Sequence, residues 1–224
     1  MKADVGERGE APVLVVASRS KKKVGELRRI MDGLIDAGLL EVLDLEEAEA
    51  RLGVTLPEVE EDAPDFAGNA EKKARAIAEA TGWWALADDS GLTVDALGGR
   101  PGVHSARYSG VTGEGRDEAN NRKLLAELSD VAGEARGAEF VCALCLVSPA
   151  GRARHVQGRC RGVIAEEPRG GHGFGYDPLF LSMEPGVAGE RTHAELSPEE
   201  KDAVSHRGRA LRALLPLVEG AMDL

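Results

Sequence analysis

The chain has 224 residues, of which 42% are hydrophobic and 30% are charged, and its formal net charge is −11. This composition is typical of a globular protein built as one large domain or as two tightly joined lobes. The negative charge excludes a general affinity for DNA or RNA, which requires a basic surface. No apolar run approaches the roughly 20 residues needed to cross a bilayer, so no membrane partner is expected.

Residues 1–11 are polar and acidic, and they match neither a secretory signal nor a transit peptide. We therefore expect a disordered tail over residues 1–11 and a cytoplasmic protein. The chain has three cysteines, Cys142, Cys145 and Cys160, and this odd number argues against a disulfide framework. Cys142 and Cys145 fall in one apolar run, where a spacing of three sends the two thiols to opposite faces of a buried strand.

The first predicted unit is a strand, a basic turn and a helix. Residues 13–17 form an apolar run of strand length, and apolar residues at helical spacing follow from Val24 to Leu34. The turn between them contains Ser18, Arg19, Ser20, Lys21, Lys22 and Lys23. A helix that begins there directs unpaired backbone amides and the positive end of its dipole at the turn. The pattern therefore predicts an anion site, and its alternative is a solvated run of charge.

An acidic loop and an alanine-rich helix come next. A second strand is expected over residues 42–45, and residues 52–64 are irregular and acidic, with Glu61 near their end. These acids are either a solvated loop or the partners of a cation. Residues 66–69 lead into an alanine-faced helix, predicted from Ala70, Ala74, Ile77, Ala78 and Ala80, that ends at Gly82 and packs its small-residue face against the sheet. Lys73 on this helix either reaches inward or lays its stem over apolar surface.

The acidic pair Asp88 and Asp89 is a concentrated chemical signal. Residues 84–87 predict a short buried strand, and Ser90 with Gly91 predicts a turn that leaves both acids at the strand's carboxyl end. Ligands bind at that end of open α/β sheets. Successive strand residues face opposite sides, so only one of the two acids can enter a single cleft, and the spacing does not decide which. The alternative is a turn with local hydrogen bonds and no chemistry.

The second half of the chain predicts a hairpin and two terminal helices. A glycine-rich loop over residues 98–110 precedes a helix over residues 117–128, and residues 138–149 and 152–160 predict a long antiparallel pair. Strands and helices that alternate first, with a hairpin later, imply a mixed sheet in an α/β fold. Ser197, Pro198 and Glu200 have the form of a capping box, which predicts a helix that begins at Pro198.

Two further clusters in this half suit a flat, polar ligand. The first lies in a glycine-rich segment and contains Phe174, Gly175, Tyr176 and Asp177. There, aromatic faces can stack on a heterocycle while amides and a carboxylate contact its edge; the alternative is an aromatic packed under a turn. The second contains Lys201, His206 and Arg207. These residues either face a phosphate or a carbonyl group, or are exposed basic residues on helices.

Taken together, six motifs resemble the inosine/xanthosine triphosphate pyrophosphatase family in its bacterial form. They are residues 18–23, 87–92, 97–102, 105–110, 173–178 and 205–208. The resemblance covers nearly everything from residue 13 to residue 217. It implies an elongated, two-lobed mixed sheet flanked by helices, with a cleft between the lobes, in a single ITPase-like domain over residues 12–221. It also implies a homodimer that uses Mg²⁺ to hydrolyse purine nucleoside triphosphates such as ITP, dITP and XTP to the monophosphate and pyrophosphate.

The resemblance also implies roles for individual residues. Asp89 matches the family's general base and metal ligand, and Glu61 falls where the family often has a second metal-binding acid. The residues that match substrate contacts are Ser18, Arg19, Ser20, Lys21, Lys22 and Lys23 for the triphosphate, Ser90, the base loop of Phe174, Gly175, Tyr176 and Asp177, and Lys201, His206 and Arg207 for the purine. Lys73 is a further candidate for substrate binding. Ser20 and Gly68 depart from the family pattern, which usually has Asn and often Glu at these positions.

Two other functions stay open at this point. A related pyrophosphatase could act on modified pyrimidine triphosphates, and a protein of another class could bind a nucleotide without catalysis. Asp89 argues against the second, because a binding module has no need of a base beside the phosphates.

Overall fold

The computed structural model describes residues 11–185, 187 and 190–222, so residues 1–10 of the expected tail lie outside the described residues. The elements, with η for 3-10 helices, are β1 (Val13–Val16), α1 (Lys21–Ile30), α2 (Asp32–Asp36), β2 (Glu41–Leu43), α3 (Leu45–Leu52), α4 (Phe66–Thr81), β3 (Trp84–Val94), η1 (Asp95–Leu97), η2 (Gly102–Arg107), α5 (Arg116–Glu127), η3 (Gly133–Arg136), β4 (Gly137–Val147), β5 (Ala153–Ile164), η4 (Asp177–Leu179), β6 (Phe180–Ser182), η5 (His193–Glu195), α6 (Pro198–Val204) and α7 (His206–Met222). Over this part of the chain, no helix combines the length and apolar character that crossing a bilayer requires.

The six strands form one sheet in the order β2-β1-β3-β4-β5-β6. β1 pairs in parallel with both β2 and β3. The pairs β3 with β4, β4 with β5, and β5 with β6 are antiparallel. The predicted mixed sheet and its long hairpin are therefore confirmed. The second strand is Glu41–Leu43 and not residues 42–45, because Asp44 caps the helix α3, which the sequence reading did not predict.

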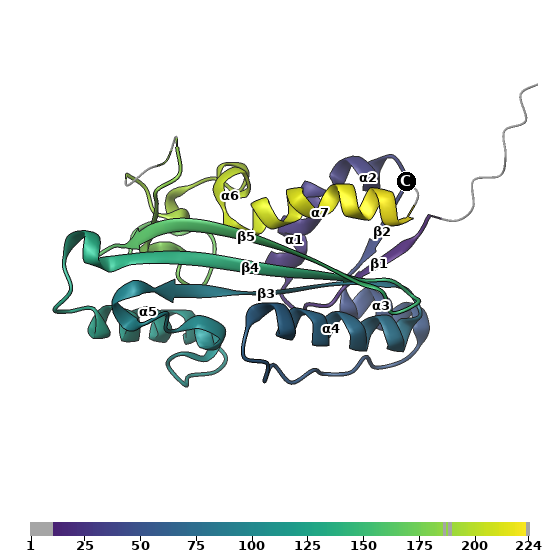
Figure 1. The fold of residues 1–224 in the computed structure, drawn as a ribbon, viewed down its shortest axis with the longest axis horizontal. Helices are drawn as coiled ribbons and strands as arrows, with labels where there is room; N and C mark the ends of the chain where they lie inside the picture. The colour runs from purple at the N-terminus through teal and green to yellow at the C-terminus, as the bar shows by residue number, and fades with distance from the viewer. Residues whose placement is uncertain (1–10, 186, 188–189, 223–224) are drawn as a thin grey trace, which may run out of the picture.

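Helices cover both faces of the long strands, with α1, α2 and α7 on one face and α3, α4 and α5 on the other (Figure 1). Alternate residues of β1 supply the two cores, because successive strand side chains point to opposite faces. Leu14 and Val16 pack with residues of α1 and α7, whereas Val15 packs with residues of α4. A third core lies around Phe140 on the far halves of β3, β4 and β5 and includes residues of α5. The expected elongated, two-lobed form is therefore confirmed.

The predicted turn after Ala87 is wrong. Strand β3 continues through both acids and ends at Val94, since its pairing with β4 runs without a break from Ala85 opposite Val147 to Val94 opposite Ala138. Gly91 serves close packing instead of a turn. A Cβ at Gly91 would meet Ser105 Oγ at 2.4 Å and Gly102 O at 2.7 Å, so only glycine lets η2 lie against the strand here.

Helix α7 packs onto β5 through another glycine. A Cβ at Gly158 would meet the His206 carbonyl oxygen at 2.1 Å and the Ala210 nitrogen at 2.5 Å. The first turn of α7 therefore lies directly on the strand, which brings His206 and Arg207 close to the middle of the sheet. The predicted placement of the cysteines is confirmed, because Cys142 and Cys145 are buried in the cores on opposite faces of β4.

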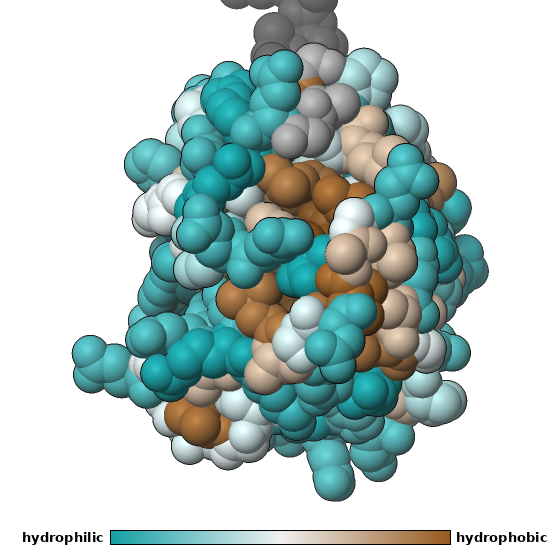
Figure 2. Space-filling view, turned by 90° about the vertical axis from the view of Figure 1, so that its left-hand side faces the viewer, coloured by the Kyte–Doolittle hydropathy of each residue, from teal (hydrophilic) through white to brown (hydrophobic). Residues whose placement is uncertain are grey.

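The lobe built around Phe140 ends in a surface where hydrophobic side chains gather within a hydrophilic surround (Figure 2). A cavity of about 520 Å³ in this lobe lies beside η3 and the end of β5. Its buried cation, Arg136, donates to the carbonyl oxygens of Leu128, Val131, Ile164 and Ala165 at 2.8–3.0 Å. These bonds tie η3 to β5, so Arg136 serves the fold.

Candidate functional site

A cavity of about 480 Å³ brings together most of the residues singled out in the sequence. Those that line it are Ser18, Arg19, Ser20, Lys23, Glu61, Lys73, Ser90, Phe174, Gly175, Tyr176, Asp177, Lys201, His206 and Arg207. Asp89 lies just behind the wall that its neighbours Glu61 and Lys73 form. The basic turn, the acidic strand, the glycine-aromatic loop and the last two helices therefore share one site, although they are far apart in the sequence.

The turn before α1 divides its basic residues between the cavity and the outer surface. Ser20 is the N-cap of α1, and its hydroxyl accepts from the Lys23 backbone N–H at 3.5 Å. Ser20 therefore caps the helix, although the family pattern usually has Asn at this position. Lys23 enters the cavity wall and forms an ion pair with Asp88. Lys21 turns outward to Asp44 and Glu46, at 2.8 and 2.7 Å.

The other basic residues of the turn contact neighbouring segments. Arg19 lines the cavity while one of its Nη atoms pairs with Glu49 at 3.1 Å. Lys22 does not line the cavity, but its Nζ donates to the Gly173 carbonyl oxygen at 2.7 Å and lies 5.7 Å from the centre of the Phe174 ring. Lys22 thus links α1 to the glycine-aromatic loop across the site.

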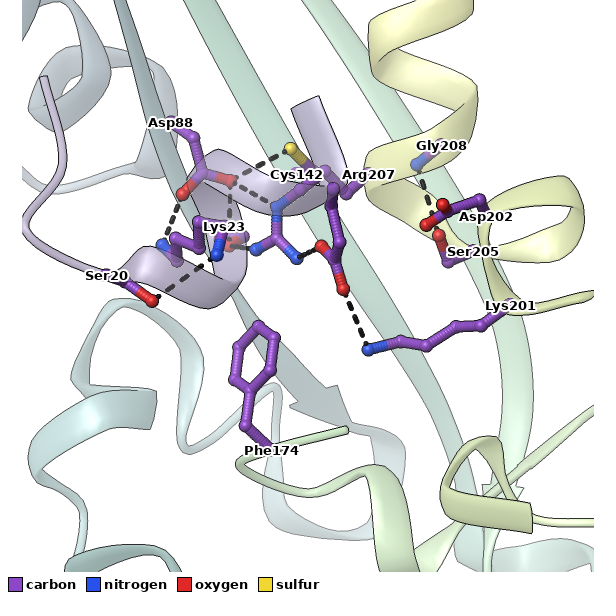
Figure 3. Close-up of polar contacts among 12 residues, drawn as sticks. Ser20, Lys23, Asp88, Cys142, Phe174, Lys201, Asp202, Ser205, Arg207 and Gly208 are labelled. Atoms are coloured by element: carbon purple, nitrogen blue, oxygen red, sulfur yellow. Dashed lines mark hydrogen bonds and ion pairs between the residues drawn. The ribbon is translucent and has the colours of Figure 1, made fainter. Parts of the chain in front are cut away.

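Asp88 and Asp89 do face opposite sides of β3, as the alternation of strand residues predicts. Asp88 points to the α7 side, where it accepts from Arg207 Nε at 3.0 Å and Cys142 Sγ at 3.3 Å and also pairs with Lys23 (Figure 3). Burial alone would raise the pKa of Asp88, but the positive charges of Arg207 and Lys23 outweigh it and hold that pKa well below its usual range. Asp88 is therefore a permanent anion that fixes two cations.

Asp89 points to the α4 side, into a different environment. Asn69 Nδ2 donates to Asp89 Oδ2 at 3.1 Å, and Lys73 Nζ lies 3.4 Å from Asp89 Oδ1. Lys73 also donates to Glu61 Oε1 at 2.7 Å and to the Asp88 carbonyl oxygen at 2.8 Å. Burial raises the pKa of Asp89, and the charge of Glu61 adds to this effect although Lys73 opposes it. Lys73 therefore reaches inward, and one ammonium group serves two carboxylates.

The donor set beside Lys73 fits a divalent cation that is only partly held by the protein. Within the described ranges, no three His, Cys, Asp or Glu side chains are grouped so that they could hold a metal. The carboxylates of Asp89 and Glu61 are both close to Lys73, so they form a two-carboxylate site. Mg²⁺ commonly binds through one or two carboxylates and keeps waters and substrate phosphate oxygens as its other ligands. The residues present therefore suit such an ion.

A chain of buried ion pairs continues from Arg207 to the glycine-aromatic loop. Arg207 Nη1 contacts Glu26 Oε2 at 2.6 Å, and Lys201 Nζ contacts Glu26 Oε1 at 3.2 Å and Asp177 Oδ2 at 2.7 Å. Burial opposes the charge on Asp177, but Lys201 outweighs it and holds the pKa of that carboxyl well below its usual range. The cations Lys201 and Arg207 lie 4.8 and 5.5 Å from the centre of the Phe174 ring, which faces them across the cavity (Figure 3).

His206 is buried at the back of the cavity and lies flat against Phe140. Its ring stacks on the Phe140 ring with centroids 4.6 Å apart. Burial, together with the nearby charges of Arg207 and Lys201, lowers the pKa of His206 well below its usual value. The folded protein therefore keeps this imidazole neutral.

This pKa shift predicts a loss of stability in weak acid. As pH falls below about 6.5, the unfolded chain binds a proton at His206 that the folded chain does not bind, so the free energy of unfolding falls by about 1.4 kcal/mol between pH 7.5 and 5.5. Urea unfolding of the wild type and His206→Asn at both pH values measures the effect, and His206→Asn should lose this part of the pH dependence. The exposed control His104→Asn should keep it; an unchanged pH dependence in His206→Asn would contradict the assignment.

A family model described as the Ham1 family matches residues 14–217. The chain belongs to the Ham1 family. Among similar Ham1-type sequences, the dITP/XTP pyrophosphatase of Frankia alni is 53% identical over 209 residues, which is 92% of this chain and 96% of the relative. That of Geobacter sulfurreducens is 52% identical over 201 residues, or 90% and 94% of the two chains. The resemblance drawn from the six motifs is therefore confirmed.

Solved structures agree with this Ham1 assignment. A HAM1 protein from Coxiella burnetii has a TM-score of 0.79 at 37% identity and covers 93% of this chain and 99% of its own. A structure named nucleoside-triphosphatase / dITP/XTP pyrophosphatase, from Mycobacterium abscessus, has a TM-score of 0.70 at 49% identity, with coverage of 91% and 99%.

The residues of this Ham1-family site that sequence reasoning missed include Glu26 and Asn69. Glu26 joins Lys201 to Arg207, and Asn69 holds Asp89. The sequence offers only a weak indication of Glu26. Two basic residues in one buried cluster require a negative charge nearby, and an acid on the facing helix can supply it. Asn69 lies in the first turn of α4, where Asp65 is already the N-cap, so the amide is free to reach the sheet.

Proposed function

We propose that this Ham1-family protein hydrolyses deaminated purine nucleoside triphosphates such as ITP, dITP and XTP to the monophosphate and pyrophosphate. One observation carries the proposal: a single cavity joins a basic helix N-terminus, an acid and a lysine that adjoin the buried Asp89 just behind the wall, and an aromatic ring faced by buried cations. These three parts match the triphosphate, the hydrolytic water and the base. Several relatives at about half identity are named dITP/XTP pyrophosphatase.

The triphosphate would lie at the start of α1. The N-terminus of that helix offers unpaired backbone N–H groups and the positive end of its dipole, which favour phosphate oxygens. Lys23 and the hydroxyl groups of Ser18 and Ser20 line the cavity at the same point. Arg19 adds a second cation, while Lys21 is directed away from the cavity and is the least suited of the turn residues to touch the substrate.

Asp89 would act as the general base. The water oxygen forms a bond to the α-phosphorus, the bond from that phosphorus to the α–β bridging oxygen breaks, and its electron pair leaves with pyrophosphate. The proton of the water passes to the Asp89 carboxylate, whose raised pKa makes it a better proton acceptor. Asn69 and Lys73 hold the carboxylate in place.

Asp89 and Glu61 would also hold a divalent ion, which we propose to be Mg²⁺. When bound, the ion would neutralise charge on the phosphates and lower the pKa of the attacking water. Lys73 pairs with both carboxylates and so keeps them close together.

The purine would lie against Phe174, with its 6-oxo group towards Arg207. Three bonds, to Asp88, Glu26 and Ser90, use three of the five N–H donors of the guanidinium, so donors remain for a carbonyl oxygen. Adenine presents an amine at the same position, which would leave a buried donor unpaired and lower the affinity. His206 and Lys201 would line the same end of the cavity.

We further propose that residues 12–221 act as one catalytic domain, and that the enzyme works in the cytoplasm as a homodimer. These proposals rest on the family resemblance. Size-exclusion chromatography with light scattering measures the oligomeric state directly.

A substrate panel tests the proposed function. Purified protein is incubated with ITP, XTP, ATP, GTP and modified pyrimidine triphosphates, with and without Mg²⁺, and pyrophosphate release is measured. We expect preferential, Mg²⁺-dependent release from ITP and XTP. Preferential release from a pyrimidine would favour the related pyrophosphatase, and ITP binding without release would favour a non-catalytic module; either result overturns the proposal.

A further inference from the structure

The loop that carries Phe174 is held by hydrogen bonds to its backbone and by one from the Tyr176 side chain. Lys22 donates to the Gly173 carbonyl oxygen at 2.7 Å, and the Phe174 N–H donates to Asp177 Oδ2 at 2.8 Å. The Tyr176 hydroxyl donates to the Ser105 carbonyl oxygen at 2.9 Å. The conformation of this loop is therefore set by the elements around it, and the position of the Phe174 ring depends on them.

Two side chains of helix α5 bind the backbone of Gly175, one at its N–H group and one at its carbonyl oxygen. Asp117 Oδ2 accepts from the Gly175 N–H at 2.8 Å, and Asn121 Nδ2 donates to the Gly175 carbonyl oxygen at 3.0 Å. Asp117 and Asn121 are four residues apart, so they lie on one face of the helix, one above the other. Together they fix the peptide groups on either side of Gly175, which has a left-handed φ of 62°.

Both side chains direct a polar atom at the loop. Asp117 Oδ1 pairs with the partly exposed Arg116 at 2.8 Å, whereas Asp117 Oδ2 is directed at the loop. Asn121 is buried, and its Oδ1 has no hydrogen-bond partner within the described part of the chain. A buried, half-satisfied amide lowers stability. Its bond to Gly175 is therefore the contact that accounts for it.

We propose that Asp117 and Asn121 are positioning residues that hold the Gly175 peptide groups and thereby fix the Phe174 ring that receives the base. This inference rests on the proposed function, in which Phe174 contacts the purine. Helix α5 lies outside the six sequence motifs. According to the proposal, it fixes the position of the aromatic wall at the end of the cavity where the base would bind. The start of α1, where the triphosphate would lie, has contacts of its own: Ser20 caps the helix and Lys23 pairs with Asp88.

Kinetics of matched variants test the proposal. Asp117→Ala removes an acceptor that is charged, so we expect KM for ITP to rise about tenfold with a smaller change in kcat. Inorganic tripolyphosphate, which lacks a base, should inhibit the wild type and Asp117→Ala with the same Ki within about twofold, since it needs only the phosphate contacts. Asp117→Asn keeps an oxygen acceptor and should restore most of the affinity for ITP. The control Glu118→Ala removes the neighbouring acid, which is exposed and pairs only weakly with Arg122, and should leave KM unchanged.

Amide exchange tests the same contact without substrate. In ligand-free protein, NMR should show faster exchange of the Gly175 amide proton in Asp117→Ala than in the wild type and Glu118→Ala. Asn121→Ala, which frees the carbonyl end of Gly175, should also raise KM for ITP and spare Ki for tripolyphosphate. Unchanged exchange and unchanged KM in both variants would overturn the proposal, as would an equal loss of ITP and tripolyphosphate binding. If the wild type fails to hydrolyse ITP, the proposed function fails, but the exchange comparison still decides whether α5 holds the loop.

Discussion

Replacing Asp89 by Asn is expected to lower kcat for ITP by about 10³-fold or more, because the amide neither accepts the proton of the attacking water nor attracts a divalent ion. The amide oxygen can still accept the hydrogen bond from Asn69, so the local packing is kept. Pyrophosphate release under saturating ITP and Mg²⁺ measures the loss.

The fold should survive this change. Burial raises the pKa of Asp89, so the folded chain binds the Asp89 proton more tightly than the unfolded chain does. Any stability from this group is therefore present at low pH and is lost as pH rises through the folded pKa. At neutral pH the ionised carboxylate costs stability, and Asp89→Asn should have a Tm equal to or above that of the wild type.

A matched control separates the acid's role from a general loss of negative charge. Asp95→Asn removes an exposed carboxylate near the end of the same strand, where it pairs with Arg161 on the surface. Its kcat should stay within about twofold of the wild type, since exposed ion pairs contribute little. If Asp89→Asn kept more than a tenth of the activity, Asp89 could not be the base.

The second large effect concerns stability. Arg207→Met should lower the free energy of unfolding by about 3–5 kcal/mol, because it leaves two buried anions, Asp88 and Glu26, without their shared cation. For a domain of this size, such a change lowers Tm by roughly 6–20 °C. Urea unfolding at pH 7.5 and differential scanning calorimetry measure it.

Two companion variants make this prediction specific. Arg209→Met removes a cation two residues along the same helix that is half-exposed and pairs with Glu184 at the surface; it should cost about 1 kcal/mol or less. Adding Asp88→Asn and Glu26→Gln to Arg207→Met should recover part of the stability, because the two buried carboxylates that have lost Arg207 are then neutral. Equal losses for Arg207→Met and Arg209→Met would show that the buried network does not stabilise the protein.

The two acids of β3 show how one strand separates two tasks. Asp88 faces cations and has a lowered pKa, while Asp89 faces an amide, a second acid and one lysine and has a raised pKa. The same residue type therefore serves as a fixed anion on one face and suits a proton acceptor on the other. The difference comes from what α7 and α4 place on each side of the sheet.

Much of this could be read from the sequence, because its evidence is local or periodic. Hydrophobic spacing predicted β1, α1, α4 and the β4–β5 hairpin, and the capping box at Ser197 predicted the start of α6 at Pro198. The motif order identified the family, and the alternation of strand residues showed that Asp88 and Asp89 face opposite sides. The turn expected at Gly91 was wrong, since a glycine that allows close packing looks the same in sequence as one that allows a turn.

Tertiary structure alone decided which charged groups meet. Glu26 lies 181 residues from Arg207, and Asp117 lies 58 residues from Gly175, yet both pairs are in contact. Sequence determines local conformation through backbone sterics and the period of apolar residues, and those rules act over a few residues. The partners of a buried charge, and therefore its pKa and its task, depend on which helices pack on which face of the sheet. That is why the sequence alone determined many of the elements and the family of this protein, while only the fold decided how Asp88, Asp89 and Gly175 are held.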